Sequence, residues 1–355
     1  MPKADAPVSR FEFWPSWIMY TPVTLLWLAL ALRYRSLTLP LISNPRITMA
    51  GMVGGSKNQV MSQAHEPLKS VILPWLYYQK TSASLRTQVR HIEAEIALKN
   101  LDYPFVCKPD TGCRGAGVRL IRSRRQLIDT LSYYPKKAGI VIQQLSQYEP
   151  EVGIFYVRQP NSDTGQIVSL TQKHTPSVIG DGTSTLEQLA SQDPRASLLL
   201  HLYETRNQQR WQQVIPAGEH ISLLFSASHC RGAVFEDARD WVTPALTNEI
   251  DYLMKALPDF CYGRLDVKYK DLESLQQGRH IEIVEINGAS SESIHIWDKR
   301  TRLSDAISTL LWQYRTLFQI GNQQRQRGFS TPGITALIRH WRYERDLTRH
   351  YPETD

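Results

Sequence analysis

The chain has 355 residues, of which 42% are hydrophobic and 21% charged. This length exceeds the roughly 100 to 200 residues of one domain, which excludes a single small binding module and favours two or three lobes around a sizeable core. The formal net charge of +7 suits nucleic acid, anionic lipid or a polyphosphate equally. The arginines, however, gather after an apolar segment and near the C-terminus, outside any nucleic-acid-binding motif, so no nucleic-acid partner is expected.

The four cysteines are scattered, with no closely spaced pair; they are Cys107, Cys113, Cys230 and Cys261. Their spacing predicts neither a zinc site nor a disulfide framework. A reduced cytoplasmic compartment is the simpler interpretation.

The N-terminal segment is strongly apolar, since residues 17–32 carry no charge and residues 13–16 extend the run. The run is close to the roughly 20 residues of a membrane-spanning helix, and Arg33 and Arg35 after it would place the rest of the chain at the cytoplasmic face. Tryptophans and prolines within it also suit a helix lying in the membrane interface. Membrane contact through residues 13–35 is therefore expected, with a buried helix of a soluble core as the alternative.

The segments after residue 36 differ in their predicted secondary structure. Residues 37–57 are rich in proline and glycine and predict a loop, in which Gly51, Gly54 and Gly55 either let the backbone approach a ligand or belong to a linker. A helix is expected within residues 81–99, and from residue 104 short β-rich runs alternate with amphipathic helices, two of them capped by Ser123 and Thr243. The pattern predicts an α+β fold.

Three regions are delimited on this basis: an apolar segment and loop at 1–60, a main domain at 80–320 and a basic tail at 321–355. The arginine-rich tail has the pattern of an appended helix. It is expected to be either solvated or bound to an anionic membrane surface.

A glycine-rich loop follows the strand predicted at 105–109. Lys108 lies near the end of that strand, and Gly112, Gly115 and Gly117 follow with Arg114 among them. Glycines let successive N–H groups converge on phosphate oxygens, and the two basic residues would supply fixed positive charge. An ordinary hairpin turn is the alternative interpretation.

Two later strands, at residues 261–269 and 280–287, each carry polar residues on one face, because side chains alternate along a strand. Arg264 and Asp266 share a face of the first, and Glu285 and Asn287 share a face of the second. If those faces coincide, two carboxylates and an amide oxygen form a sparse set of the kind that Mg²⁺ prefers. A surface salt bridge between Arg264 and Asp266 is the alternative.

Together, the sequences GRLDV and VEIN and the preceding lysine–proline strand with its glycine-rich loop resemble the ATP-grasp superfamily, most closely its D-alanine–D-alanine ligase and cyanophycin synthetase branches. The resemblance covers residues 85–317 and implies two α+β lobes that grip ATP. A GDG-containing turn and helix at 178–189 is similar to one in the cyanophycin synthetase branch.

The resemblance implies a role for each matching position. Lys108, Lys173 and the loop with Thr111, Gly112, Gly115 and Gly117 would contact the phosphates, Gln143, Gln144 and Leu145 would receive adenine, and Glu151 would lie near the ribose. Asp266, Glu285 and Asn287 would bind magnesium, with Mn²⁺ as an alternative metal. The catalytic residues would be Arg264, Lys108 and Arg114.

The implied activity is an ATP-dependent carboxylate–amine or carboxylate–thiol ligase that acts through an acyl phosphate on small-molecule or lipid-linked substrates. The chain departs from the ligases after Asn287, where their proline–glycine turn is replaced by residues 288–293, so D-alanine specificity is not carried over. A kinase of the same fold is the alternative activity, and a module that has lost catalysis is disfavoured because every expected metal ligand is present. The resemblance also allows a homodimer, and the expected location is the cytoplasm or the cytoplasmic face of a membrane.

Overall fold

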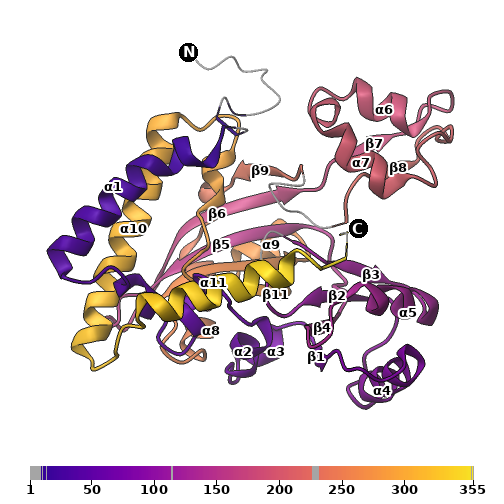
Figure 1. Ribbon diagram of the computed structural model, residues 1–355. Coiled ribbons are helices and arrows are strands. Elements are labelled where there is room, and N and C mark those ends of the chain that lie inside the picture. The colour runs from indigo at the N-terminus through magenta and orange to yellow at the C-terminus, as the bar shows by residue number, and fades with distance from the viewer. Residues whose placement is uncertain are drawn as a thin grey trace.

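The computed structural model describes residues 9, 11–12, 14–112, 115–225, 232–352 and 354. Figure 1 shows two antiparallel sheets, a small peripheral unit, and helices from both ends of the chain that pack around them. The α+β fold class expected from the sequence is confirmed.

The first sheet has the strand order β1-β4-β2-β3. Its strands are β1 (Trp75–Gln79), β2 (Phe105–Pro109), β3 (Arg119–Ile121) and β4 (Gly139–Gln144). Helices α4 (Leu85–Leu98) and α5 (Arg124–Tyr133) bury their apolar faces against it in one core. The side-chain oxygens of Ser84 and Ser123 accept hydrogen bonds from backbone N–H groups in the first turns of these helices. Serine is a preferred N-cap residue for this reason.

The second sheet has the order β11-β10-β5-β6-β9. Its strands are β5 (Glu151–Val157), β6 (Gln166–His174), β9 (Val234–Asp237), β10 (Tyr262–Tyr269) and β11 (Ile281–Asn287). One face packs on helices and forms the largest core of the chain; these helices are α2 (Lys57–Ser62), α3 (Leu68–Val71), α8 (Pro244–Lys255) and α9 (Leu272–Gln276). Thr243 caps α8 as expected, whereas β1 and β9 have no counterpart in the sequence prediction.

A third, smaller unit lies at the periphery (Figure 1) and has its own apolar cluster. It comprises β7 (Ser177–Ile179), α6 (Leu186–Gln192), η3 (Ala196–Leu199), α7 (Leu200–Asn207) and β8 (His220–Ser222). Thr185 and Gln188 form a reciprocal capping box at the start of α6, so the GDG sequence is followed by a turn and a helix as predicted.

The apolar N-terminal segment forms the helix α1 (Ser16–Tyr34), which packs along α10 (Leu303–Gln326). Trp27 meets Phe318 edge-on with 5.2 Å between ring centroids. Within the described residues, α1 alone is long and apolar enough to cross a membrane, and little of it is buried. One side of the helix thus belongs to the protein core while the other remains exposed.

The prediction of an unpacked loop at residues 37–57 is wrong. Two short helices form there, η1 (Leu39–Ile42) and η2 (Thr48–Gly51), and η1 is fully buried. The side chain of Asn44 binds the backbone of Cys261 and Tyr262, with N–O distances of 2.8 to 3.1 Å. Proline and glycine content predicted a surface loop, but the apolar residues between them pack against α10 and the second sheet.

The C-terminal region also differs from the expected appendage. Helix α10 runs continuously through residue 321, where the sequence suggested a boundary. Helix α11 (Ile334–Thr348) then returns across the molecule, and in Figure 1 its C-terminal end points toward the first sheet. The remaining short helices are η5 (Arg239–Trp241) and η6 (Ile294–Trp297).

Cys107 and Cys261 are buried, unpaired thiols. Cys113 and Cys230 lie outside the described residues.

Candidate functional site

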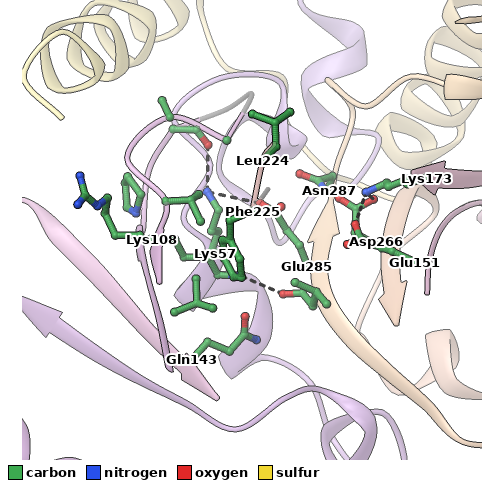
Figure 2. A pocket seen from close by; sticks show the side chains of 18 of the residues that line it. Lys57, Lys108, Gln143, Glu151, Lys173, Leu224, Phe225, Asp266, Glu285 and Asn287 are labelled. Atoms are coloured by element: carbon green, nitrogen blue, oxygen red, sulfur yellow. Dashed lines mark hydrogen bonds and ion pairs between the residues drawn. The ribbon is translucent and has the colours of Figure 1, made fainter. Parts of the chain in front are cut away.

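A cavity of about 2160 Å³ separates the two sheets and contains most of the residues singled out from the sequence. Its lining includes Lys108, Gly112, Gly115, Gln143, Gln144, Leu145, Glu151, Lys173, Arg264, Asp266, Glu285 and Asn287. Thr111 and Gly117 belong to the same loop but do not line the cavity, and Arg114 lies outside the described residues. Residues far apart in the sequence therefore meet in one place (Figure 2).

The pairing of β10 with β11 brings the expected polar faces together. Asp266 lies opposite Glu285, and Arg264 lies opposite Asn287. Directly opposed residues of an antiparallel pair point to the same face of a sheet. The shared face predicted from side-chain alternation is confirmed.

Asp266 is the centre of a dense polar network. Its carboxylate contacts Lys173 Nζ at 2.7 Å, Arg264 Nε at 2.9 Å and Asn287 Nδ2 at 3.2 Å. Burial alone would raise the pKa of Asp266, but the cations of Arg264 and Lys173 outweigh it and hold that pKa well below its usual value. The carboxylate is therefore ionised at neutral pH.

Glu151 adds a second carboxylate from the neighbouring strand β5. Its side chain contacts Lys173 Nζ at 2.7 Å and Lys268 Nζ at 3.4 Å. Burial lowers the pKa of Lys173, but Asp266 and Glu151 reverse that effect and raise it overall. Lys173 is thus a cation at neutral pH, and Figure 2 shows it between the two carboxylates.

Lys108 reaches from the first sheet to the second. A β-bulge in β11 leaves Val284 out of register, because Asp266 pairs with Glu285 while Val267 pairs with Ile283. Lys108 Nζ donates to the Val284 carbonyl at 2.9 Å. Burial lowers the pKa of Lys108 to about 8, since its partner is a neutral carbonyl group and Glu285 compensates only partly.

Lys57 is a site residue that sequence reasoning missed. It begins α2, directly after the cap Ser56, and its Nζ lies 3.5 Å from Glu285 and 3.0 Å from the Gly112 carbonyl. It therefore links the glycine-rich loop to the acidic pair on the second sheet. The available signal was the cluster of glycines, serine and lysine at residues 54–57, which resembles the composition of a phosphate-binding turn.

The glycine-rich loop needs glycine for its conformation. Gly117 has φ +73°, and a Cβ there would lie 2.8 Å from Pro109 Cγ. Its carbonyl accepts a hydrogen bond from the Tyr134 hydroxyl at 2.6 Å. The loop is thus fixed at its end by the first sheet's core while Gly112 and Gly115 face the cavity.

The strand β4 leads from the first sheet to the second through residues 145–150, so it has the position of a hinge. The Gln143 amide donates to the Leu73 carbonyl at 3.3 Å, and the Gln144 side chain accepts from the Asp102 N–H at 3.3 Å. These bonds fix the end of the strand, and the apolar Val60, Leu73 and Leu145 line the cavity beside it.

The side-chain oxygens of Asp266, Glu285 and Asn287 are of the kind that binds a magnesium ion. Two ionised carboxylates and an amide oxygen from adjacent strands are hard ligands, and they leave positions for water and phosphate oxygens. Among the described residues, no group of three or more His, Cys, Asp or Glu side chains is arranged as a metal centre.

The far end of the cavity is lined by residues around Glu292. The carboxyl group accepts from Trp297 Nε1 at 3.3 Å, while the Glu292 carbonyl accepts from Arg264 Nη1 at 3.4 Å. Met19 and Tyr20 from the first turns of α1 line the same end. This end therefore lies beyond Arg264 and next to the apolar N-terminal helix.

No protein-family model and no curated protein matches this chain. Among solved structures, it is similar to a D-alanine–D-alanine ligase from Bacillus anthracis with 13% identity over 80% of this chain and 72% of that one, at a TM-score of 0.44. A bifunctional glutathione synthetase from Pasteurella multocida matches with 18% identity over 72% of this chain and a TM-score of 0.36. The present chain spans only 36% of that protein's length.

The ATP-grasp ligase PsnB, in complex with a minimal precursor, matches with 14% identity over 73% of this chain and 59% of that one, at a TM-score of 0.35. These are similarities to solved ligases at TM-scores below 0.5. Because these scores are low, we infer its function from its own residues.

Proposed function

We propose that the chain is an ATP-dependent ligase that activates a carboxylate as an acyl phosphate and transfers the acyl group to an amine. The main support is one arrangement of charges. Four cations, Lys57, Lys108, Lys173 and Arg264, surround the carboxylates of Glu151, Asp266 and Glu285 in a cavity between two sheets. Such a mixed set can bind a polyphosphate together with its metal, which a site of one charge sign cannot do.

The cations would hold and polarise the phosphates. Lys108 and Lys57 extend from the side of the glycine-rich loop, and Lys173 extends from the second sheet. Mg²⁺ bound by Asp266, Glu285 and Asn287 would neutralise charge on the phosphate oxygens. Catalysis would then rest on positioning and on electrostatic stabilisation.

The reaction comprises two displacements. A carboxylate oxygen of the first substrate bonds to the γ-phosphorus of ATP, and the bond to the bridging oxygen of ADP breaks. The amine nitrogen then bonds to the acyl carbon, and phosphate and a proton leave. Arg264 lies between the acidic pair and Glu292, so we assign it to the oxyanion that forms during amine attack, where one donor contributes about 2.7 to 4 kcal/mol.

Release of ADP and free phosphate tests this function. Purified chain is given Mg-ATP with fractions of small molecules and lipids, and both products are measured in parallel. We expect equal release of the two and an adduct whose mass equals carboxylate plus amine minus water. Asp266→Asn should lower turnover by at least about a hundredfold, because several kcal/mol of metal-assisted stabilisation are lost.

Asp240→Asn is the matched control, since Asp240 is an exposed acid away from the cavity. It should leave turnover unchanged, and thermal unfolding of both variants checks that they fold. ADP without equal free phosphate, together with a phosphorylated product, would show a kinase. ATP turnover that is unaffected by Asp266→Asn would contradict the assigned site.

We further propose that α1 lies on a membrane surface rather than spanning it. Its buried side packs on α10, whereas its other side exposes Trp17, Leu25, Leu28 and Leu32 as one stripe that ends in arginines. To span a membrane, α1 would have to separate from α10, and the contact of Trp27 with Phe318 would be lost. Since the first turns of α1 also line the cavity, an amphiphilic substrate would enter from the membrane side.

A further inference from the structure

Helix α11 turns one face toward the cavity. Trp341, Glu344, Arg345, Thr348 and Arg349 line it, and their spacing of three and four residues places them on one side of the helix. No residue of α11 is buried, so apolar packing does not explain why the helix lies there. Figure 1 shows it crossing in front of the second sheet.

Hydrogen bonds attach this C-terminal segment to the backbone of the phosphate-binding region. Glu344 Oε2 accepts from the Gly54 N–H at 2.6 Å. The Tyr351 hydroxyl donates to the Thr111 carbonyl at 2.6 Å, and the Thr354 hydroxyl donates to the Gly115 carbonyl at 2.6 Å. The last two bonds attach the backbone of the glycine-rich loop, at Thr111 and Gly115, to the C-terminal segment.

The Tyr351 ring also packs against this loop. A Cβ on Gly112 would lie 3.2 Å from Tyr351 Cε2, and one on Gly117 would lie 3.2 Å from Tyr351 Cβ. On its other side the ring meets Tyr134 of the first sheet's core, with centroids 5.9 Å apart. The loop is therefore held between its own sheet and the C-terminal segment.

The cavity face of α11 brings positive charge that the rest of the site does not neutralise. Arg349 makes no ion pair within the part of the chain that the structure describes. Arg345 stacks over Trp341 at 4.6 Å, and among the described residues its one counter-ion is its neighbour Asp346, at 3.6 Å. By contrast, Lys57, Lys173 and Arg264 already contact carboxylates.

We propose that α11 is part of the nucleotide site: Arg345 and Arg349 bind the phosphate oxygens of ATP, while Tyr351 and Thr354 position the glycine-rich loop. This inference rests on the proposed function, since it takes ATP as the anion. Guanidinium groups match phosphate oxygens by their paired donors, and stacking on Trp341 orients Arg345 in advance. The basic tail is thereby assigned to ATP and not to a lipid surface.

Nucleotide binding without an acceptor substrate tests the proposal. The double variant Arg345→Gln with Arg349→Gln is compared with Arg339→Gln and Arg342→Gln, which removes the same charge from exposed positions of α11 that do not line the cavity. For the first pair, we expect the affinity for Mg-ATP to fall by about tenfold or more, as loss of charged hydrogen bonds predicts. Affinity for AMP should change less than about twofold, and the second pair should affect neither nucleotide.

Each outcome separates the two proposals. Equal losses in both double variants would reveal only a general field of positive charge and would overturn the inference. Unchanged ATP affinity in the Arg345 and Arg349 variant would also overturn it, while leaving the proposed ligase intact. A wild-type chain that binds no ATP would contradict the proposed function itself.

A second measurement tests the positioning role of Tyr351. Tyr351→Phe removes only the hydroxyl group that donates to the Thr111 carbonyl, and Tyr343→Phe is the control at an exposed position outside the cavity lining. We expect hydrogen exchange of the amides at 109–118 to become faster in Tyr351→Phe, with the KM for ATP raised more than kcat is lowered. Unchanged exchange and an unchanged KM would overturn this part of the proposal.

Discussion

Burial favours the protonated form of the Glu292 carboxyl group. Burial raises its pKa from 4.5 to about 7, and the bond from Trp297 only partly offsets this. No Lys, Arg or His side chain forms an ion pair with it within the described residues. A group whose pKa is raised on folding binds its proton more tightly in the native state, so stability falls as pH rises from about 4.5 through 7.

Glu292→Gln should remove this pH dependence. We expect the variant to match the wild-type Tm near pH 4.5, where folded Glu292 is protonated, and to exceed it at pH 8, where the folded wild type holds a buried charge. Thermal unfolding across this range measures the difference. Glu204→Gln, at an exposed position on α7, should show no such trend, and a difference that is the same at both pH values would contradict the assignment.

At the scale of elements, the pairing of β10 with β11 depends on a close backbone approach at Gly263. A Cβ there would lie 2.0 Å from the Asn287 carbonyl oxygen and 2.6 Å from Phe260 Cζ. Neither contact can be relieved without moving β11 or the core. Gly263 therefore fixes the distance between the strands that bear Arg264, Asp266, Glu285 and Asn287.

Gly263→Ala should lower the free energy of unfolding by about 1 to 3 kcal/mol or more, because the added methyl group overpacks the strand pair. Denaturant unfolding gives this value, and ATP turnover should fall as well because Asn287 is displaced. Gly333→Ala is the control, since its φ is −70° and a Cβ there would meet only Thr335 Oγ1 at 3.8 Å. Equal stability of the two variants would contradict the packing argument.

At the scale of the whole molecule, α1 joins the exposed apolar surface to the substrate end of the cavity. Vesicles of anionic phospholipid test the proposed membrane contact in a sedimentation assay. Leu25→Ser with Leu32→Ser should weaken binding by at least about tenfold, since each buried leucine contributes about 1.5 to 3 kcal/mol. Leu98→Ser with Ile179→Ser removes two exposed apolar side chains elsewhere and should leave binding unchanged.

Failure of the wild-type chain to bind these vesicles, or equal losses in both pairs of variants, would contradict membrane contact through α1. The homodimer remains a prediction, because nothing in the single chain tests it.

Sequence alone was sufficient for the elements with a strong periodicity. Short β-rich runs between turns predicted the strands that became β2, β3, β4, β5 and β6, and alternation predicted the polar faces of β10 and β11. Serine and threonine caps predicted the starts of α5 and α8. Alternation also placed Asp266 on one face with Arg264, because that relation is local to one strand. Most of the candidate site followed from such local patterns and from the motif resemblance.

Only the tertiary structure decided what long-range packing controls. The register that opposes Asp266 to Glu285, and the bulge that offers the Val284 carbonyl to Lys108, depend on pairing between strands. Lys57 belongs to the site because it contacts Glu285, which is far away in the sequence. Many of residues 39–51 are buried because distant elements cover them. The position of α11 over the cavity had no local signal, since α11 and the residues after it bond to backbone groups more than 200 residues earlier in the chain.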